Sequence, residues 1–308
     1  MVERVGVLGF GEAGGCFARL ARASGASVVV YDHNVARGGP KAGDKARLAD
    51  EIGVELTGDV GDLVGSDVLL SVVAPRTTVA AAEAYAAVHH GETVPVWVDL
   101  NSTAPEVKVA VAEHLGDVGV AALDGVLLGG GVRLDGDEVP ILVAGPGYDE
   151  VAARLRGLGL HADGLNDEVG AASALKMLRS AGIKGFEAQM VEVLIAADRY
   201  GLVEPVLASL ADLFDRFPAR SLFEHLLQSH ADHCGRRSGE MAMVRDTLTA
   251  RDVDPVMAEA ALAVFERSAR APAPPPWTDE RSLADVIAHL RAGMDAERTD
   301  GAPLVEVD

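Results

Sequence analysis

Four polar residues, Ser173, Lys176, Ser180 and Lys184, recur at offsets of three and four within one long segment that lacks proline. In an α-helix this spacing places them along one face, where small residues surround them. A small, polar strip that contains a lysine is a natural lining for a cleft. A lysine amine can exchange a proton when burial and nearby positive charge, here from Lys184 and Arg179, lower its pKa. The alternative is an ordinary surface lysine near a helix end.

The segment that carries this strip, residues 166–202, is rich in Ala, Leu, Met and Glu and predicts a single helix. At 1.5 Å per residue such a helix would span roughly 50 Å, which is more than one domain usually needs. We therefore predict a first domain over residues 1–166 and an all-helical second domain over residues 167–308. The long helix, residues 167–201, would connect them.

A second group of residues suited to chemistry follows the apolar run at residues 5–8: Gly9, Phe10, Gly11, Glu12, Ala13 and Gly14. A helical pattern comes next, and then a second apolar run that ends at Asp32. In this context Gly9 allows a tight turn, Gly11 lets backbone approach a pyrophosphate, and Gly14 permits close helix–strand packing. The pattern predicts a dinucleotide site, and a glycine turn of another α/β fold is the alternative.

Asp32 indicates which dinucleotide would bind. It lies 18 residues after Gly14, where an acid can accept hydrogen bonds from the adenosine ribose hydroxyls. A carboxylate there repels a 2′-phosphate, so NAD is preferred over NADP. His33, Arg37 and Lys41 follow closely and could still help to bind a phosphate. The alternative role of Asp32 is simply to end the strand.

Short apolar runs continue to alternate with helical segments along the first domain. We expect strands at residues 54–56, 67–73, 93–98, 118–123 and 140–144, and a last edge strand at residues 161–165. This order predicts an α/β fold with a Rossmann-type, doubly wound parallel sheet. An all-helical C-terminal domain would follow it.

Ligands bind beyond the carboxyl ends of the strands in such a sheet, which directs attention to three loops. The first contains Val73 and Ala74, and the second contains Asn101, Ser102 and Thr103. Residues 103–106 also form a capping-box pattern, so capping a helix is the alternative role of the second loop. Glycines 129–131 form the third loop, which could approach a ligand or be a flexible turn.

Four segments in this order resemble the β-hydroxyacid dehydrogenases, the superfamily that includes 6-phosphogluconate and 3-hydroxyisobutyrate dehydrogenases. They are the cofactor turn at residues 9–14, the substrate loop DLNSTAP at 99–105, the motif DGVLLGG at 124–130 and the catalytic segment GAASALK at 170–176. The resemblance covers roughly residues 3–200. Asn101 and Ser102 stand where the family has a Ser-Thr pair, and Arg179 and Ser180 where it commonly has two asparagines. The sequence looks closest to a poorly characterised branch with its own C-terminal helical domain.

The resemblance implies an NAD(P)-dependent dehydrogenase that oxidises the CH–OH group of a small hydroxy acid, or reduces the corresponding keto acid. The substrate would carry a carboxylate or phosphate, and Lys176 would be the general acid/base. Cofactor contacts are implied for residues 9–14, Asp32, Val73, Ala74 and Asn101. Substrate contacts are implied for Asn101, Ser102, Thr103, Gly129, Gly130 and Ser180. No metal is implied, because the nicotinamide supplies the redox chemistry.

Two other functions stay open. Imine reductases resemble the same architecture but usually replace the lysine with another proton donor, so the presence of Lys176 argues against that activity. A nucleotide-binding sensor without turnover is the alternative from another class of protein.

The amino-acid composition limits the cellular compartment and the classes of partner that we expect for this protein. The 308 residues include 27 Lys and Arg against 47 Asp and Glu, and a formal charge of −20 argues against a nucleic-acid partner. Only Cys16 and Cys234 are present, which fits a reducing cytoplasm. No apolar run approaches the ~20 residues that span a bilayer. We expect a cytoplasmic protein that acts on a small molecule.

The second domain should consist of helices at residues 206–216, 220–233, 239–250, 255–267 and 282–298, with a break at 271–276. Apolar helices that need a covering surface predict a homodimer. A nearby group could suggest a metal site but fits no standard ligand spacing: His225, His230, Asp232, His233 and Cys234. Arg236, Arg237 and Glu240 either enter the cleft, where an arginine would clamp an anion, or form a solvated turn.

Overall fold

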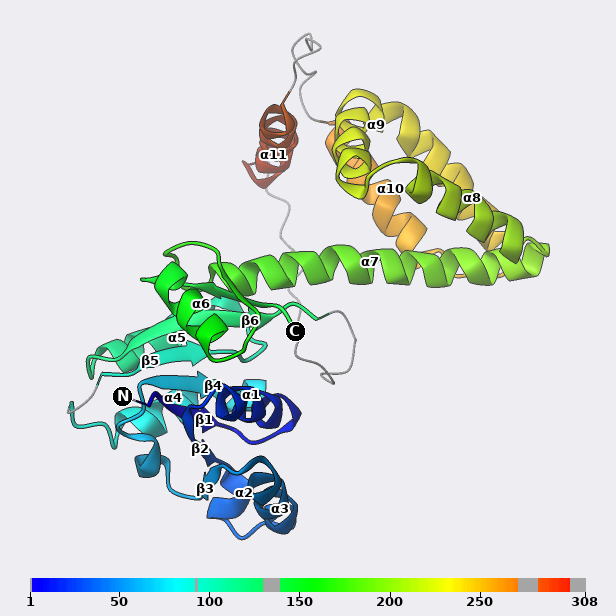
Figure 1. The fold of residues 1–308 in the computed structure, drawn as a ribbon. Coiled ribbons are helices and arrows are strands. Elements are labelled where there is room, and N and C mark those ends of the chain that lie inside the picture. Colours follow the sequence, from blue (N-terminus) through cyan, green and yellow to red (C-terminus); the bar gives the residue numbers. More distant parts are fainter. Residues whose placement is uncertain (1, 92–93, 130–138, 271–281, 300–308) are drawn as a thin grey trace. The chain divides into compact units, whose positions relative to one another are not determined.

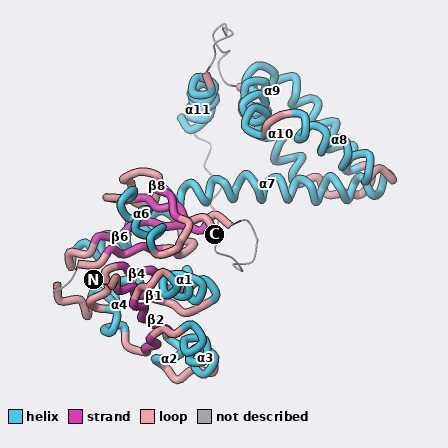
Figure 2. The backbone as a smooth tube through the Cα atoms, viewed as in Figure 1, coloured by secondary structure: helices cyan, strands magenta, loops and turns pink. Residues whose placement is uncertain are grey.

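The computed structural model describes residues 2–91, 94–129, 139–270 and 282–299. The chain divides into two compact units, Met1–Ala181 and Gly182–Asp308. The first unit contains the sheet and the second consists of helices, as the coloured ribbon and tube show (Figures 1 and 2).

An eight-stranded sheet in the order β3-β2-β1-β4-β5-β6-β7-β8 forms the centre of the first unit. Its strands are β1 (Arg4–Leu8), β2 (Ser27–Tyr31), β3 (Glu55–Thr57), β4 (Val68–Ser71), β5 (Val96–Asp99), β6 (Ala121–Leu127), β7 (Ile141–Ala144) and β8 (Ala162–Gly164). The predicted doubly wound sheet is confirmed, and β8 is its edge. One pair differs from the prediction: β6 and β7 are antiparallel, and the Leu128 N–H extends their ladder to the Pro140 carbonyl.

Helices cover the sheet because its strands bury side chains on both faces. The helices are α1 (Glu12–Ala23), α2 (His33–Ala36), α3 (Ala42–Ile52), α4 (Thr78–Ala86), α5 (Pro105–Gly116) and α6 (Tyr148–Gly157). Along β4, Val68 and Leu70 enter one apolar cluster, whereas Leu69 enters the other with Trp97 and Leu115. Near-continuous apolar strands are what a parallel sheet covered on both faces requires.

The carboxyl ends of three strands meet at one edge of the sheet. In the strand register Leu8 pairs with Ser71, Ser71 with Asp99, and Asp99 with Asp124. A hydroxyl and two carboxylates therefore stand in a row where the loops after β1, β4 and β5 begin, although β6 continues past the expected end at Asp124 to Leu127. Ligands of open α/β sheets bind at this end.

The predicted long helix is present as α7 (Ala171–Tyr200), a single helix of 30 residues. It starts at Ala171 rather than at Asn166, because Gly170 has a φ of +97° that an α-helix cannot contain. Upstream, the Asn166 side chain accepts a hydrogen bond from the Glu168 N–H at 3.1 Å and forms a turn of its own. Gly201, with a φ of +71°, ends the helix.

The second unit contains α8 (Val203–Arg216), α9 (Ala219–Thr249), α10 (Val256–Ala269) and α11 (Leu283–Thr299). The all-helical prediction is confirmed, but α9 is one helix of 31 residues instead of two. Gly235 and Gly239 lie inside it, and each costs only about 1 kcal/mol relative to alanine, which packing against α10 can offset. The predicted break at residues 271–276 lies outside the described residues. Within the described ranges no helix is long and apolar enough to cross a membrane.

Candidate functional site

The glycine turn between β1 and α1 has the shape that a phosphate site needs. Gly9 has a φ of +105°, and a Cβ there would overlap the Val72 carbonyl. A Cβ at Gly14 would overlap the Gly9 carbonyl, so both positions require glycine. A Cβ at Gly11 would meet no described atom within 4 Å. Backbone of the turn is therefore open to a ligand at Gly11.

The N-terminus of α1 provides hydrogen-bond donors at the same place. Gly11 is its N-cap residue, and no described side chain accepts a hydrogen bond from the first turn. Free N–H groups and the partial positive charge of a helix N-terminus stabilise an anion such as a pyrophosphate. The residues fit a dinucleotide at this turn.

Asp32, at the end of β2, is buried and held by several donors. It accepts hydrogen bonds from the Asn34 N–H at 2.8 Å, the Asn34 side chain at 2.9 Å and the Phe10 N–H at 3.3 Å. Burial raises the pKa of Asp32, but the hydrogen bonds from Asn34 and Phe10 and the charge of Lys45 outweigh it and lower the pKa. The carboxylate is therefore ionised. It also caps α2, which is the structural role weighed as its alternative.

Lys45 is a residue of this region that the sequence reading did not single out. Its Nζ lies 3.7 Å from Asp32 Oδ2 and donates a hydrogen bond to the Phe10 carbonyl. The lysine reaches the glycine turn from α3, a helix that the order of motifs did not connect with the cofactor. It adds positive charge beside the Asp32 carboxylate.

Asn101 ties the loop after β5 to the loop after β4. Its Oδ1 accepts a hydrogen bond from the Val73 N–H at 2.6 Å, and its Nδ2 donates to the Ser71 hydroxyl at 3.0 Å. Asp99 in turn accepts a hydrogen bond from the Asn101 N–H at 2.9 Å. The structure thus brings together the two loops expected to face the cofactor. The Asn101 amide is buried and engaged within the protein.

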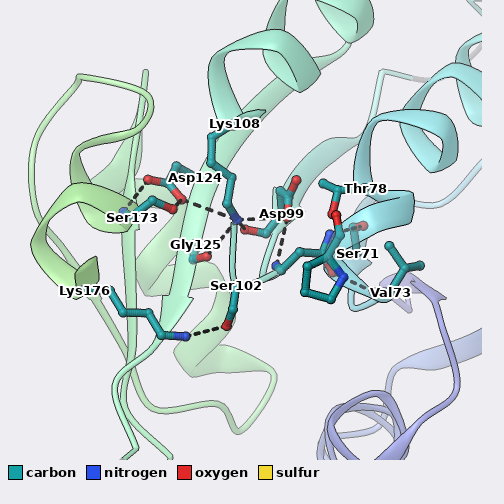
Figure 3. Close-up of polar contacts among 12 residues, drawn as sticks. Ser71, Val73, Thr78, Asp99, Ser102, Lys108, Asp124, Gly125, Ser173 and Lys176 are labelled. Carbon is teal, nitrogen blue, oxygen red and sulfur yellow. Dashed lines mark hydrogen bonds and ion pairs between the residues drawn. The ribbon is translucent and has the colours of Figure 1, made fainter. Parts of the chain in front are cut away.

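Lys176 and Ser102 meet at the carboxyl end of β5. The Lys176 Nζ donates a hydrogen bond to the Ser102 hydroxyl at 2.6 Å, a contact between α7 and the loop after β5 (Figure 3). Burial lowers the pKa of Lys176, the positive charge of Lys108 lowers it further, and the negative charge of Asp124 opposes both effects. The site therefore holds an amine that loses its proton more easily than an ordinary lysine.

The polar strip on α7 divides into two parts. Ser173 is fully buried, and its N–H and hydroxyl both donate to the Asp124 carboxylate at 2.7 Å. The expectation that Ser173 lines a cleft is therefore wrong, because Asp124 binds it inside the fold. Ser180 is half-buried one turn beyond Lys176. Lys184 is exposed in the second unit, and the positive charge that acts on Lys176 comes from Lys108 rather than from Lys184.

The other residues predicted to contact the substrate differ in their exposure to solvent. Thr103 is buried, and its hydroxyl has no hydrogen-bond partner within the described part of the chain. The capping box is wrong, because α5 begins at Pro105 with Ala104 as its uncapped N-cap residue, one position beyond Thr103. Gly129 is exposed, whereas Gly130 lies outside the described residues. Arg179 donates to the Leu128 carbonyl at 3.2 Å.

A hollow of about 740 Å³ lies between the start of α5, the turn at residues 165–170 and the start of α7. Glu106, Glu168 and Arg179 are its charged lining residues, among apolar ones such as Val109 and Leu178. Its lining includes Pro105, which lies three residues after Ser102, but neither Ser102 nor Lys176 is among the lining residues.

Lys108 is the principal site residue that sequence reasoning missed. It is buried between Asp99 and Asp124, at 2.9 Å and 3.5 Å from their carboxylates. A signal existed, because Lys108 shares the buried face of α5 with Val111 and Leu115 at offsets of three and seven. A lysine in an apolar face indicates a buried partner.

In the second unit, the residues considered for the cleft interact with their own helix. Arg236 pairs with Glu240, and Arg237 donates to the Ser229 hydroxyl at 2.7 Å. All four lie on the continuous α9, so the predicted turn at this point is wrong. His230 packs on Phe265, with ring centroids 4.6 Å apart. No three His, Cys, Asp or Glu side chains in the described ranges are arranged to hold a metal ion.

Comparison with known proteins finds relatives of similar length that share this fold. Residues 197–268 match a family described as a domain of unknown function, DUF1932. A conserved hypothetical protein from Sinorhizobium meliloti 1021 is 30% identical, covers 95% of this chain and 97% of its own, and has a TM-score of 0.61. The conserved protein MTH1747, of unknown function and structurally similar to 3-hydroxyacid dehydrogenases, is 29% identical over 93% and 99% of the chains, with a TM-score of 0.60.

An imine reductase from Myxococcus stipitatus in complex with NADP+ shares the fold. Its TM-score is 0.70 at 16% identity, over 93% of this chain and 99% of that one. At this identity the likeness concerns the fold alone. The identity to the Sinorhizobium meliloti protein over nearly the whole of both chains puts this chain in one family with it. Together with the likeness to MTH1747, it shows that this chain belongs to the β-hydroxyacid dehydrogenase-like superfamily.

Proposed function

We propose that the protein is an NAD(P)-dependent oxidoreductase that transfers a hydride between nicotinamide and the alcohol or carbonyl carbon of a small hydroxy acid. The observation that carries this proposal is the 2.6 Å hydrogen bond between the Lys176 amine and the Ser102 hydroxyl. It lies just beyond the carboxyl end of β5, and β4 and β1, which end in register with β5, are the next strands of the sheet.

The cofactor would bind along residues 9–14, with further contacts from Asp32, Val73, Ala74 and Asn101. The open backbone at Gly11 and the uncapped α1 support this assignment. The ionised Asp32 favours NAD, because a carboxylate repels a 2′-phosphate. Lys45 offsets part of that repulsion, so NADP stays a second cofactor. The Myxococcus stipitatus imine reductase binds NADP+ on the same fold.

The nicotinamide, when bound, accepts the hydride from the alcohol carbon or returns it to the carbonyl carbon. In oxidation, a neutral Lys176 takes the hydroxyl proton as the C–O bond becomes a carbonyl. In reduction, a protonated Lys176 returns that proton to the carbonyl oxygen. Ser102 holds the amine in place and offers its hydroxyl to the same substrate oxygen.

The proposed substrate class is the one that the family resemblance implies, and one cation near this pair supports it. Arg179 stands one turn from Lys176 and lines the hollow beside α5, where its guanidinium could hold a carboxylate or phosphate. Ser180, Thr103, Gly129 and Gly130 complete the proposed substrate contacts. We propose a small anionic hydroxy acid as the substrate.

Lys176→Ala is the direct test of the catalytic proposal. A panel of 3-hydroxy acids and their keto acids is assayed for cofactor reduction or oxidation, and cofactor binding is followed by NAD(P)H fluorescence. We expect kcat to fall about 10²- to 10⁴-fold, the usual contribution of a general acid or base, with an unchanged Kd for the cofactor. Lys184→Ala, at an exposed position two turns further along the same helix, is the control and should keep full activity.

Two outcomes would favour other functions. A protein that binds NAD(P)H but turns over no member of the panel would be a nucleotide-binding sensor. The fold shared with an imine reductase makes cyclic imines the second panel. Turnover of imines with retained activity in Lys176→Ala would assign the protein to that reaction and remove Lys176 from the mechanism.

A further inference from the structure

Lys108 on α5 is a fully buried ammonium group with four acceptors around it. Its Nζ donates to the Asp99 carboxylate at 2.9 Å, the Asp99 carbonyl at 2.7 Å and the Gly125 carbonyl at 3.2 Å. The Asp124 carboxylate lies 3.5 Å away (Figure 3). Burying a charge is costly unless it is paired and hydrogen-bonded, and this lysine is both. The arrangement is therefore a built ionic cluster: Asp99, Lys108 and Asp124.

Each carboxylate of the cluster also holds one half of the candidate active site. The oxygen of Asp99 that binds Lys108 accepts the Asn101 N–H at 2.9 Å, and Asn101 directly precedes Ser102. Asp124 binds the N–H and hydroxyl of Ser173 at 2.7 Å, one helical turn before Lys176. Lys108 thus links the loop that carries Ser102 to the helix that carries Lys176.

The cluster is also the main source of charge close to Lys176. Among the described residues, Lys108 from α5 and Asp124 from β6 act on the amine, and Asp99 from β5 lies on the other side of Lys108. On α7 itself, Arg179 is directed to the Leu128 carbonyl. With Asp99 and Asp124 ionised, the cluster carries one net negative charge, and without the lysine it would carry two.

We propose that Lys108 is a positioning residue for proton transfer, which keeps Ser102 and Lys176 in contact and offsets the negative charge of Asp124 beside the Lys176 amine. This inference rests on the proposed role of Lys176 as the acid/base. Its electrostatic part is measurable without substrate, so the two can fail separately.

The test titrates Lys176 in the intact protein. The lysines whose amines are accessible are methylated reductively with ¹³C-formaldehyde, and the signal of Lys176 is assigned by its loss in Lys176→Arg. Lys108→Met keeps most of the length of the side chain and removes the charge. We expect the midpoint of the Lys176 titration to rise by on the order of one pH unit. The reason is that the positive charge of Lys108, which disfavours the ammonium form of Lys176, is lost in a partly buried site.

Asp99→Asn is the matched variant with the opposite sign. Asp99 Oδ1 can keep its bonds to Asn101 and Lys108, and its Oδ2 has no hydrogen-bond partner among the described residues. Removing this negative charge leaves the charge of Lys108 less compensated, so it should lower the Lys176 midpoint, by less than Lys108→Met raises it because Asp99 contacts Lys108 and not Lys176. General loosening of the site would move both variants in the same direction, so opposite shifts identify the electrostatic role.

Circular dichroism verifies the fold of each variant before titration. If Lys108→Met does not fold, Asp99→Asn decides alone: a midpoint equal to that of the wild type or higher overturns the proposal. If both fold, the proposal is overturned by a midpoint that does not rise in Lys108→Met. Opposite shifts with no turnover of any hydroxy acid would keep the cluster's role and reject the dehydrogenase function.

With an active substrate, the pH profile gives a second readout. In the oxidation direction, the alkaline rise of kcat/KM should move in Lys108→Met by the same amount as the titration midpoint. A fall in kcat/KM with an unmoved profile would mean that Lys108 only stabilises the fold.

Discussion

Lys176 is the residue whose environment most directly affects the proposed activity, because that environment sets the pKa of its amine. Its pKa lies below the ordinary value of 10.5 because burial and Lys108 both disfavour the ammonium form. In oxidation the neutral amine is the active form, so kcat/KM should rise with pH and level off above the pKa. In reduction the ammonium is active, so the rate should fall through the same pH. Stopped-flow rates in both directions should give one shared midpoint below 10.5.

Asp32 and Lys45 make cofactor choice testable at two neighbouring residues. Asp32→Asn removes the carboxylate that a 2′-phosphate would face, so we expect the Kd ratio of NADPH to NADH to fall roughly tenfold. Lys45→Met removes the cation 3.7 Å away and should move the same ratio in the opposite direction. Fluorescence titration of both nucleotides measures the ratio without any substrate. If the two variants had the same Kd ratio of NADPH to NADH, neither residue would discriminate between a 2′-hydroxyl and a 2′-phosphate.

At the scale of an element, the start of α7 decides whether Lys176 can reach Ser102. Gly170 precedes the helix with a φ of +97°, and a Cβ there would contact Pro105 at 3.3 Å. Gly170→Ala should therefore lower the free energy of unfolding by about 1–2 kcal/mol. Gly182→Ala in the same helix meets no described atom and should instead raise it by ~0.5–1 kcal/mol. Urea unfolding of both variants tests the contrast, and equal effects would contradict it.

The same element shows why a polar pattern on a helix needs a partner to be interpreted. Ser173 and Lys176 are neighbours on one face of α7, yet Ser173 is bound by Asp124 and Lys176 is bound by Ser102. Spacing places residues on a face, and the neighbouring strand ends determine what each side chain binds. The buried Lys108 on α5 illustrates this as well, because its two carboxylates come from strands that are distant in sequence.

At the scale of the whole molecule, the second unit leaves large apolar side chains on its surface. They include Phe214, Phe217, Phe223 and Leu226, of which Phe223 is 55% exposed. Exposed apolar helix faces favour association, so we expect a homodimer of twice 32.0 kDa by sedimentation equilibrium. Phe223→Asp should weaken that dimer at least about tenfold, whereas Val94→Asp in the first unit should not. A wild-type protein that sediments at 32.0 kDa would contradict the prediction.

The sequence alone determined the features that depend on local spacing. Glycines at residues 9, 11 and 14 between two apolar strands can be placed without a structure, because the turn requires them within a few residues. The alternating strands and the long α7 follow from hydrophobic period and length in the same way. The boundaries were less predictable: the helix start at Gly170 and the unbroken α9 depend on backbone conformation and on packing that residue types do not specify.

Only the tertiary structure decided which side chains meet. The parallel register of β4, β5 and β6 brings Ser71, Asp99 and Asp124 into one row, and α5 inserts Lys108 between the last two. No spacing rule links these positions, because each lies on a different element and their contact depends on strand order. For the same reason the cation that lies beside Asp32 is Lys45, although Arg37 and Lys41 are closer to Asp32 in the sequence. Contacts between residues that are distant in sequence thus determine the charges around Lys176, and these charges help to determine how easily its amine loses a proton.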